Sequence, residues 1–269
     1  MSKEILKKYN IKAKKSLGQN FLVNDKIVEQ IANIIELENK NIVEVGPWYW
    51  ALTQKLLEKN PKNLSLVELD KDMIAILQDR INSWDLNLRN TDFKINNIDI
   101  LKFDPEFNNY SVIANIPYYI TSPILRHFLY DLKNKPEAMV ILMQKDVWDK
   151  ILDNKKKSVL SLMVAKKAKV SEKIFVWKQN FIPSPKVESS VLLFESHNLY
   201  DKIDDNKFLE LIKKWFLSPR KKLVKNLVNS WFSKDLVVKN LEKIWVSTDS
   251  RPENLWIEDW CKLTNLLFN

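Results

Sequence analysis

The chain has 269 residues, of which 45% are hydrophobic and 29% charged, so it can bury a full core and is not a disordered protein. Its formal net charge of +9 favours a polyanionic partner, and nucleic acid is the first candidate. No apolar run approaches the ~18 residues that span a bilayer, and the start of the chain lacks the apolar core of a signal peptide. We expect a soluble, cytoplasmic protein with no membrane partner, acting as a monomer.

Four residue types have unusual counts. Cys261 is the single cysteine, which rules out an internal disulfide and a thiolate metal cluster, and only His127 and His197 are histidines. Chemistry without a metal is therefore favoured. The chain also has ten tryptophans but only two glycines, whereas glycine averages ~7% of residues in proteins.

The first predicted elements precede the sheet. Residues 1–15 contain six lysines and no apolar period, which predicts a flexible basic arm, with a merely solvated tail as the alternative. Residues 25–36 have apolar side chains at helical spacing after an Asn24-Asp25 cap, which predicts a helix that leads into the first strand.

Beyond residue 40, short apolar runs alternate with helical patterns, as is typical of a parallel sheet covered by helices on both faces. The predicted strands are 41–45, 64–69, 93–95, 111–114 and 138–143, and the predicted helices are 52–58, 71–81, 123–132, 145–152 and 159–166. Two further strand candidates, 169–175 and 187–194, suit a hairpin that closes the edge of the sheet. The proline-stiffened loop 181–185 between them is expected to project rather than pair.

A polar stretch at 197–206 predicts a linker, and residues 207–269 predict helices separated by short turns. The carboxyl-terminal part is therefore expected to form a small all-α domain.

Two carboxylates at predicted strand ends could bind an adenosine cofactor, because open α/β sheets bind ligands outside the carboxyl ends of their strands. Glu68 lies roughly twenty residues after the glycine turn at Gly46, the spacing at which a carboxylate can accept ribose hydroxyl groups. Asp99 follows the third strand and can accept from the exocyclic amine of the cofactor's adenine. A helix cap or a surface residue is the alternative for each alone, but the order and spacing support the cofactor site.

The fourth strand ends in Asn115-Ile116-Pro117-Tyr118, and these residue types fit methylation of the adenine amino group. That nitrogen is a poor nucleophile because its lone pair is delocalised into the ring. The side-chain oxygen of Asn115 and the main-chain oxygen of Ile116 or Pro117 could draw the pair back and align it with a sulfonium methyl group. Pro117 would stiffen the turn, and Tyr118 and Phe181 could stack on the two faces of an extruded base. A strand-ending turn and a core phenylalanine are the alternatives.

Seven motifs, taken together, resemble the ribosomal RNA adenine dimethyltransferase family, specifically its bacterial members that dimethylate two adjacent adenines near the 3′ end of 16S rRNA. The motifs are 16–22 (SLGQNFL), 43–47 (VEVGP), 68–70 (ELD), 115–118 (NIPY), 143–147 (MQKDV), 181–189 (FIPSPKVES) and 251–255 (RPENL). Methylases that modify large-subunit rRNA are similar to a lesser degree, because the 251–255 ending looks like that of the small-subunit enzymes.

The resemblance implies an α/β fold with a Rossmann-like class I methyltransferase sheet, mostly parallel with an antiparallel edge hairpin. It implies an S-adenosyl-L-methionine-dependent domain over 16–198 and a helical rRNA-binding domain over 207–269. By the resemblance, Asn20 and Leu22 would close over the methionine end of the cofactor and Gly46 would lie beneath it. Glu68 would hold the ribose, Asp99 the adenine, and Asn115 would serve both cofactor and target.

The resemblance also implies an rRNA-contacting face on the helical domain, with small-subunit rRNA or a pre-assembled small ribosomal subunit as the partner. Its expected phosphate contacts are Lys213, Lys214, Arg220, Lys221, Lys222 and Lys225. A solvated helix is the alternative for any single lysine.

The chain departs from the family at its cofactor loop, which reads Gly46-Pro47-Trp48-Tyr49-Trp50 where the family has Gly-Pro-Gly-X-Gly. Glycine is needed there because the backbone turns tightly and approaches the cofactor closely. Trp148, Trp215 and Trp245 also replace small residues, whereas Trp260 stands where an aromatic is expected. One hypothesis is that some of these tryptophans are glycines in the cell, because the source organism reads UGA as glycine.

Three functions remain open from the sequence. The first is an active rRNA dimethyltransferase. The second is a catalytically silent RNA-binding ribosome-assembly factor, which is the better interpretation if Trp48 and Trp50 are genuine. The third is a DNA adenine methyltransferase, which shares the chemistry of residues 115–118 but is not expected to have the 251–255 ending.

Overall fold

The computed structural model describes residues 2–48, 50–83, 85–117, 120–153, 155–219, 221–228 and 232–268. The chain forms two compact units, each built from two stretches of sequence. The first contains Met1–Trp148 and Val170–Ser196, and the second contains Asp149–Lys169 and His197–Asn269.

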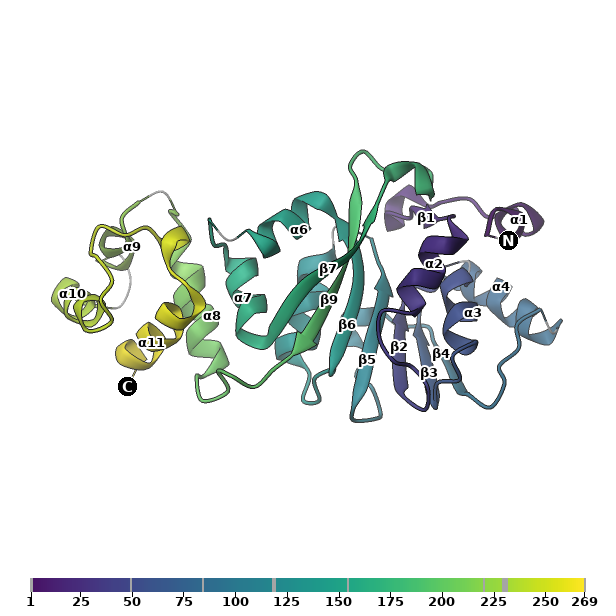
Figure 1. Cartoon of the computed structure of the whole chain (residues 1–269), viewed down its shortest axis with the longest axis horizontal. Coiled ribbons are helices and arrows are strands. Elements are labelled where there is room, and N and C mark those ends of the chain that lie inside the picture. The colour runs from purple at the N-terminus through teal and green to yellow at the C-terminus, as the bar shows by residue number, and fades with distance from the viewer. Residues whose placement is uncertain are drawn as a thin grey trace. The chain divides into compact units, whose positions relative to one another are not determined.

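A seven-stranded sheet forms the centre of the first unit, in the order β4-β3-β2-β5-β6-β9-β7 (Figure 1). The strands are β2 (Asn41–Val45), β3 (Asn63–Val67), β4 (Asp92–Asn96), β5 (Tyr110–Asn115), β6 (Ala138–Gln144), β7 (Ala168–Val176) and β9 (Ser189–Ser196). Strands β4, β3, β2, β5 and β6 run parallel, and β9 is antiparallel to β6. The predicted Rossmann-like sheet with an antiparallel edge is thus confirmed.

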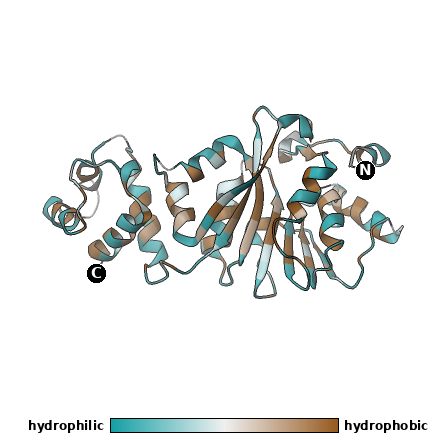
Figure 2. Ribbon diagram, viewed as in Figure 1, coloured by the Kyte–Doolittle hydropathy of each residue, from teal (hydrophilic) through white to brown (hydrophobic). Residues whose placement is uncertain are grey.

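Apolar runs explain the central strands, since strands buried on both faces have continuous hydrophobic sequences. Every residue of the run Met139–Met143 in β6 is at most 2% exposed, and Ile42 and Val43 of β2 are fully buried. In Figure 2 the strands at the middle of the sheet are brown, whereas the helices show both brown and teal faces. The edge strand β4 has no fully buried residue, as expected for a strand with one neighbour.

The helices of the first unit are α1 (Ser2–Lys8), α2 (Asp25–Ala32), α3 (Ala51–Leu57), α4 (Lys71–Asn82) and α5 (Thr121–Arg126), the last followed by a π-helical turn at His127–Asp131. The predicted Asn24 cap is confirmed, because its side chain accepts the N–H groups of Lys26 and Ile27. Asp70 caps α4 in the same way by accepting the N–H of Asp72. Short 3-10 turns occur at Lys15–Leu17, Ile100–Lys102 and Lys178–Asn180.

The prediction that loop 181–185 projects without pairing is wrong. Phe181–Ile182 forms β8, which pairs antiparallel with β1 (Phe21–Leu22) in a separate two-stranded sheet. Pro183 follows directly and cannot donate to a ladder, which explains why the pairing ends after two residues.

The amino-terminal residues also differ from the expected flexible arm. Residues 2–8 form α1, Leu6 is 9% exposed, and Lys8 pairs with Asp85 at 2.6 Å. Tyr9 donates to Asp79 at 3.1 Å, so the arm contacts acidic residues of α4 and the turn after it. The acidic partners lie far from the amino-terminal residues in the sequence, so the number of lysines alone could not indicate these contacts.

The second unit contains α7 (Val159–Lys167), α8 (Asp205–Trp215), α9 (Leu223–Val228), α10 (Lys234–Lys243), α11 (Ile257–Phe268) and the end of α6 (Lys145–Leu152), with a 3-10 turn at Pro252–Asn254. Its helical character agrees with the sequence, but the range 16–198 predicted for the sheet domain includes α7, which lies in the second unit. Lys166 of α7 explains the difference: the fully buried ammonium group donates to the Ile203 carbonyl at 2.9 Å and pairs with Asp205 of α8. Among the described residues, no helix is long and apolar enough to cross a membrane.

Candidate functional site

Three strands place the predicted site residues at one edge of the sheet. Val45 of β2 is in register with Val67 of β3 and with Ala114 of β5, so the next residues along each strand are Gly46, Glu68 and Asn115. The N–H of Gly46 donates to the Val67 carbonyl at 3.0 Å, which holds the first turn against the end of β3. The carboxyl edge of the parallel sheet is the expected ligand position in such folds.

A pocket opens at this edge. It is lined by residues of the amino-terminal segment and of the turns after β2, β3, β4 and β5: Leu17, Gln19, Val45, Gly46, Trp48, Val67, Glu68, Leu69, Ile98, Asp99, Ile100, Ile116, Pro117 and Ile120. The structure thus brings together Gly46, Glu68, Asp99 and Pro117 from the predicted site. Leu22 and Asn115 line a smaller hollow, which shares Gly46 and Trp48 with the pocket.

The two carboxylate oxygens of Glu68 have different surroundings. Its Oε1 accepts the N–H of Asp70 at 2.7 Å, whereas Oε2 is buried and accepts no hydrogen bond of normal geometry from the described residues. Burial raises the pKa of Glu68 to about 7; the main-chain N–H groups of Asp70, Leu69 and Trp48 lower it, and the charge of Asp70 raises it. A buried carboxylate oxygen without a partner is costly, and it marks a position where a hydroxyl donor would be stabilising.

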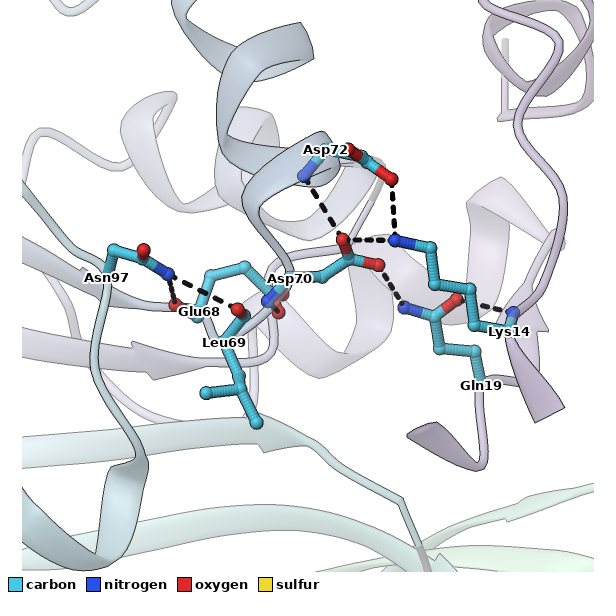
Figure 3. A network of polar contacts seen from close by, with 7 residues as sticks. All are labelled: Lys14, Gln19, Glu68, Leu69, Asp70, Asp72 and Asn97. Carbon is cyan, nitrogen blue, oxygen red and sulfur yellow. Dashed lines mark hydrogen bonds and ion pairs between the residues drawn. The ribbon is translucent and has the colours of Figure 1, made fainter. Parts of the chain in front are cut away.

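Glu68 also belongs to a polar network that continues to both sides (Figure 3). Asn97 donates to the main-chain carbonyls of Glu68 and Leu69, at 2.9 and 3.3 Å, which fixes the turn after β3. On the other side, Asp70 accepts from Gln19 and Lys14 of the amino-terminal segment. In the sequence, Asp70 stands out only as part of the 68–70 motif, and its pairing with Lys14 has no local sequence signal.

Asp99 lines the pocket and also caps a short helical turn, which was the alternative interpretation to adenine binding. Its Oδ1 accepts the N–H of Leu101 at 3.0 Å and begins the 3-10 turn after β4. The cap uses one oxygen, so Asp99 retains acceptor capacity toward the pocket.

Gly46 is required by the approach of β5. Its φ is +69°, and a Cβ atom at this position would lie 2.7 Å from the main-chain oxygen of Asn115. No side chain fits there without a backbone shift, so the turn after β2 and the end of β5 can contact each other only through glycine.

Trp48 and Trp50 follow in backbone conformations that glycine favours, with φ of +46° and +65°. Trp48 packs edge-to-face on Phe21, with ring centroids 5.6 Å apart, and lines both hollows, which places its indole between them. Trp50 is fully buried, and its indole N–H has no hydrogen-bond partner among the described residues. The open space of the pocket is about 70 Å³, whereas small-molecule pockets are typically ~300–1,000 Å³.

Glu44 is a buried carboxyl group that sequence reasoning did not single out. It lies on β2 two residues before Gly46 and is fully buried, and no hydrogen bond of normal geometry from a described residue reaches it. Burial raises the pKa of Glu44 to about 8; the nearby Thr53 hydroxyl lowers it and the charge of Glu68 raises it. Its side chain is therefore largely protonated at neutral pH.

The remaining predicted residues have mixed placements. Asn20 donates to the Gly18 carbonyl at 3.2 Å and does not line the pocket. Phe181 is 3% exposed and packs in the core cluster with Phe21 and Trp48, as its alternative interpretation predicted. Tyr118 lies outside the described residues.

The predicted phosphate contacts lie on α8, α9 and the turn between them. Lys213, Lys221 and Lys225 are exposed. Lys214 pairs with Glu210 at 2.6 Å, and Lys222 with Asp249 at 2.7 Å. Arg220 lies outside the described residues.

The parallel sheet, its antiparallel edge and the site at the carboxyl ends of β2, β3 and β5 define a Rossmann-like methyltransferase. The chain belongs to the ribosomal RNA adenine dimethylase family, whose model it matches over residues 10–268. It is similar to the Ribosomal RNA small subunit methyltransferase A of Pelagibacter ubique, with 34% identity over 94% of this chain and 96% of the relative. The protein of the same name from Mycoplasma mobile is 37% identical, over 90% of this chain and 93% of the relative.

Solved structures support the fold. A dimethyladenosine transferase from Plasmodium falciparum superposes with a TM-score of 0.77 at 24% identity, covering 90% of this chain and 95% of its own. The 23S rRNA methyltransferase ErmE superposes with a TM-score of 0.71 at 21% identity, covering 93% and 100%.

Proposed function

We propose that this protein dimethylates the N6 amino groups of two adjacent adenines near the 3′ end of 16S rRNA, with S-adenosyl-L-methionine as methyl donor. It acts in small-subunit biogenesis as a cytoplasmic monomer. The observation that carries the proposal is the position of Asn115, which ends β5 against Gly46 and beside the pocket that holds Glu68. Family membership supports the same reaction.

The adenosine half of the pocket fits the cofactor. The unpartnered Glu68 Oε2 suits a ribose hydroxyl donor, and Asp99 suits the adenine amine. Ile98 and Ile100 supply apolar surface for the adenine ring. The cofactor supplies a methyl group on a sulfonium centre, and the chain's part is to bind it and exclude water.

The target half rests on acceptors at the end of β5. Asn115 makes no side-chain hydrogen bond to a described residue, so its amide oxygen is available to one N–H of the adenine. The Pro117 carbonyl already accepts the N–H of Ile120 at 3.2 Å, which favours the Ile116 carbonyl as the second acceptor. Both acceptors would orient the nitrogen lone pair, and Tyr118 remains the proposed stacking residue, whereas Phe181 packs in the core.

The rRNA contacts belong to the helical unit in this proposal. Lys213, Lys221 and Lys225 are exposed and suited to phosphate, and Arg220 completes the set. Lys214 and Lys222 already have acidic partners, so we assign them the smaller share of the binding energy.

The methionine half of the pocket does not fit the cofactor while Trp48 fills it. We propose that positions 48, 50 and 245 are glycine in the working protein, because the three tryptophans have φ of +46°, +65° and +61°. Of the other non-glycine residues described at positive φ, four are asparagines, which tolerate this region, and one is Arg89. Bulky aromatic residues are outliers there.

Trp245 supports this recoding from a part of the chain outside the cofactor loop. It follows the last residue of α10 and its cap, Ile244; its N–H donates to Glu242 and the N–H of Val246 donates to Leu241, both at 3.0 Å. This pair of bonds is the Schellman motif, in which the residue at the position of Trp245 is usually glycine. The indole is 95% exposed, so no packing holds it there.

Mass spectrometry of the protein purified from its source organism tests the recoding. We expect peptides covering residues 48, 50 and 245 to be lighter than the printed sequence requires. At each position the difference should be that between an indolylmethyl side chain and a hydrogen atom. Tryptophan at 48 and 50 in those peptides would refute the recoding and favour the catalytically silent RNA-binding factor.

A methylation assay tests the function itself. With the protein carrying Trp48→Gly and Trp50→Gly, small-subunit particles lacking the modification should accept methyl groups at N6 of two adjacent adenines, whereas duplex DNA should not. The Asn115→Ala variant serves as the control. Equal activity of that variant, or preference for DNA, would overturn the proposal.

A further inference from the structure

Residues 14–19 form a closed turn at the edge of the pocket. The N–H of Lys14 donates to the side-chain oxygen of Gln19 at 2.9 Å, and the N–H of Gln19 donates back to the Lys14 carbonyl at 3.4 Å. Gly18, at φ +60°, completes the turn. Because Leu17 and Gln19 line the pocket, this turn is one of its walls.

One buried carboxylate holds both ends of the turn. Asp70 is 4% exposed; its Oδ1 accepts from the Lys14 ammonium at 2.7 Å, and its Oδ2 accepts from the Gln19 amide at 3.1 Å (Figure 3). Lys14 also pairs with the exposed Asp72 at 2.6 Å. Burial alone would raise the pKa of Asp70, but the bonds from Lys14, Gln19 and the N–H of Asp72 together lower it, so Asp70 remains ionised.

Asp70 is also joined to the proposed ribose-binding residue. Its N–H donates to Glu68 Oε1 at 2.7 Å, which fixes the orientation of the Glu68 carboxylate beside the pocket. The side chain of Asp70 therefore fixes the turn at residues 14–19, and its main-chain N–H orients the carboxylate of Glu68. At the far end of the same segment, Leu22 of β1 is in register with Phe181 of β8, so the wall is anchored at both ends.

We propose that Asp70 is a positioning residue that, with Lys14 and Gln19, latches residues 14–22 over the cofactor pocket. The inference rests on the proposed use of S-adenosylmethionine, but the latch itself is a property of the free protein. Opening it would move Leu17 and Gln19 away from Glu68 and loosen the segment that carries Asn20 and Leu22, the residues proposed to close over the methionine end. The latch thus sets cofactor affinity and not the chemistry at Asn115.

Three variants test the latch: Asp70→Asn, Gln19→Ala and Lys14→Met. Asparagine caps a helix as well as aspartate does, so Asp70→Asn retains the start of α4 but loses the charge and places a donor beside Gln19. Lys14→Arg retains the ion pairs and should behave as the parent. Lys8→Met is the matched control, since it removes the exposed Lys8–Asp85 pair elsewhere on the amino-terminal segment.

Two measurements separate the latch from the proposed function. In the absence of cofactor, amide hydrogen exchange of residues 15–22 should be faster in Asp70→Asn and Lys14→Met than in the parent and in Lys8→Met, and unchanged exchange would overturn the latch.

The Kd for S-adenosylmethionine should rise about tenfold in these variants, the effect of losing a charged hydrogen bond, while kcat at saturating cofactor changes less than about twofold. The parent for this second measurement carries Trp48→Gly and Trp50→Gly. Failure of that parent to bind the cofactor would refute the proposed function. A fall of kcat in Asp70→Asn as large as the rise in Kd would refute the proposal that Asp70 is a positioning residue.

Discussion

The turns that follow β2 and β5 lie side by side, and they differ in how well their residues suit their backbones. At the end of β5, none of Asn115, Ile116 and Pro117 has a positive φ, and they present acceptors at the strand end. After β2, Gly46 suits its φ of +69°, but Trp48 and Trp50 occupy glycine-like conformations and leave an indole N–H without a partner among the described residues. Local preferences in natural sequences as a rule agree with the fold, and two bulky residues in glycine-like conformations break that agreement, which points to the residue identities.

The largest effect is expected at the β5 turn. Asn115→Ala removes the acceptor on the adenine amine, and loss of one such preorganised group costs ~10²–10³-fold in kcat. Single-turnover methylation of small-subunit particles, with the parent and the variant both carrying Trp48→Gly and Trp50→Gly, measures the effect. Asn63→Ala, which changes an asparagine at the start of β3 far along the strand from the site, is the control and should retain activity. A fall of less than about tenfold for Asn115→Ala would show that the β5 turn is not the target site.

Gly46→Ala tests the contact between the two turns. The added Cβ would lie 2.7 Å from the Asn115 carbonyl and would impose a positive φ on alanine, so we expect the free energy of unfolding to fall by about 2–3 kcal/mol. Urea denaturation monitored by circular dichroism gives this value. Wild-type stability in the variant would contradict the close approach of β2 and β5.

Glu44 makes the β2 side of the site sensitive to pH. The pKa of Glu44 is about 8 in the folded protein, compared with 4.5 for an unperturbed glutamate. The folded state therefore binds the proton more tightly than the unfolded state does. The stability that Glu44 contributes is complete below pH 4.5 and is lost as the pH rises through about 8, at no more than about 1.4 kcal/mol per pH unit. Glu44→Gln mimics the protonated form and should exceed the parent in stability at pH 9 but not at pH 5. Parallel pH profiles of the free energy of unfolding for the two proteins would argue against a buried neutral Glu44.

The smallest effect is expected at Trp245, where only the backbone conflict is tested. Because the side chain is 95% exposed and φ is +61°, Trp245→Gly should stabilise the protein by about 1 kcal/mol. Trp177, which is 58% exposed with φ of −64°, is the matched control, and Trp177→Gly should not stabilise. If the two variants shift the thermal midpoint equally, the positive φ of Trp245 does not explain the stabilisation.

Periodicity and strand-end residues predicted most of the fold and the position of the site. The alternation of apolar runs with helical patterns predicted the parallel strands, and the positions of Gly46, Glu68 and Asn115 after β2, β3 and β5 predicted their common edge. These features are local, because they depend on spacing along the chain.

Features that depend on distant partners could not be predicted in the same way. The amino-terminal lysines suggested a flexible arm because their partners, Asp70 and Asp85, are more than 50 residues away. Phe181–Ile182 suggested a projecting loop because its pairing with β1 spans most of the first unit. Buried Lys166 gave no sign in the sequence that α7 belongs with the helical unit.

Binding of S-adenosylmethionine, measured by calorimetry for the chain as printed and for the Trp48→Gly, Trp50→Gly double variant, tests the account most directly. Replacing the two indoles should join the hollows on either side of Trp48, so we expect micromolar affinity in the double variant and at least about a hundredfold weaker binding in the printed chain. Equal affinity of the two proteins would show that Trp48 and Trp50 do not obstruct the pocket. No binding by either would show that the edge of β2, β3 and β5 is not a cofactor site.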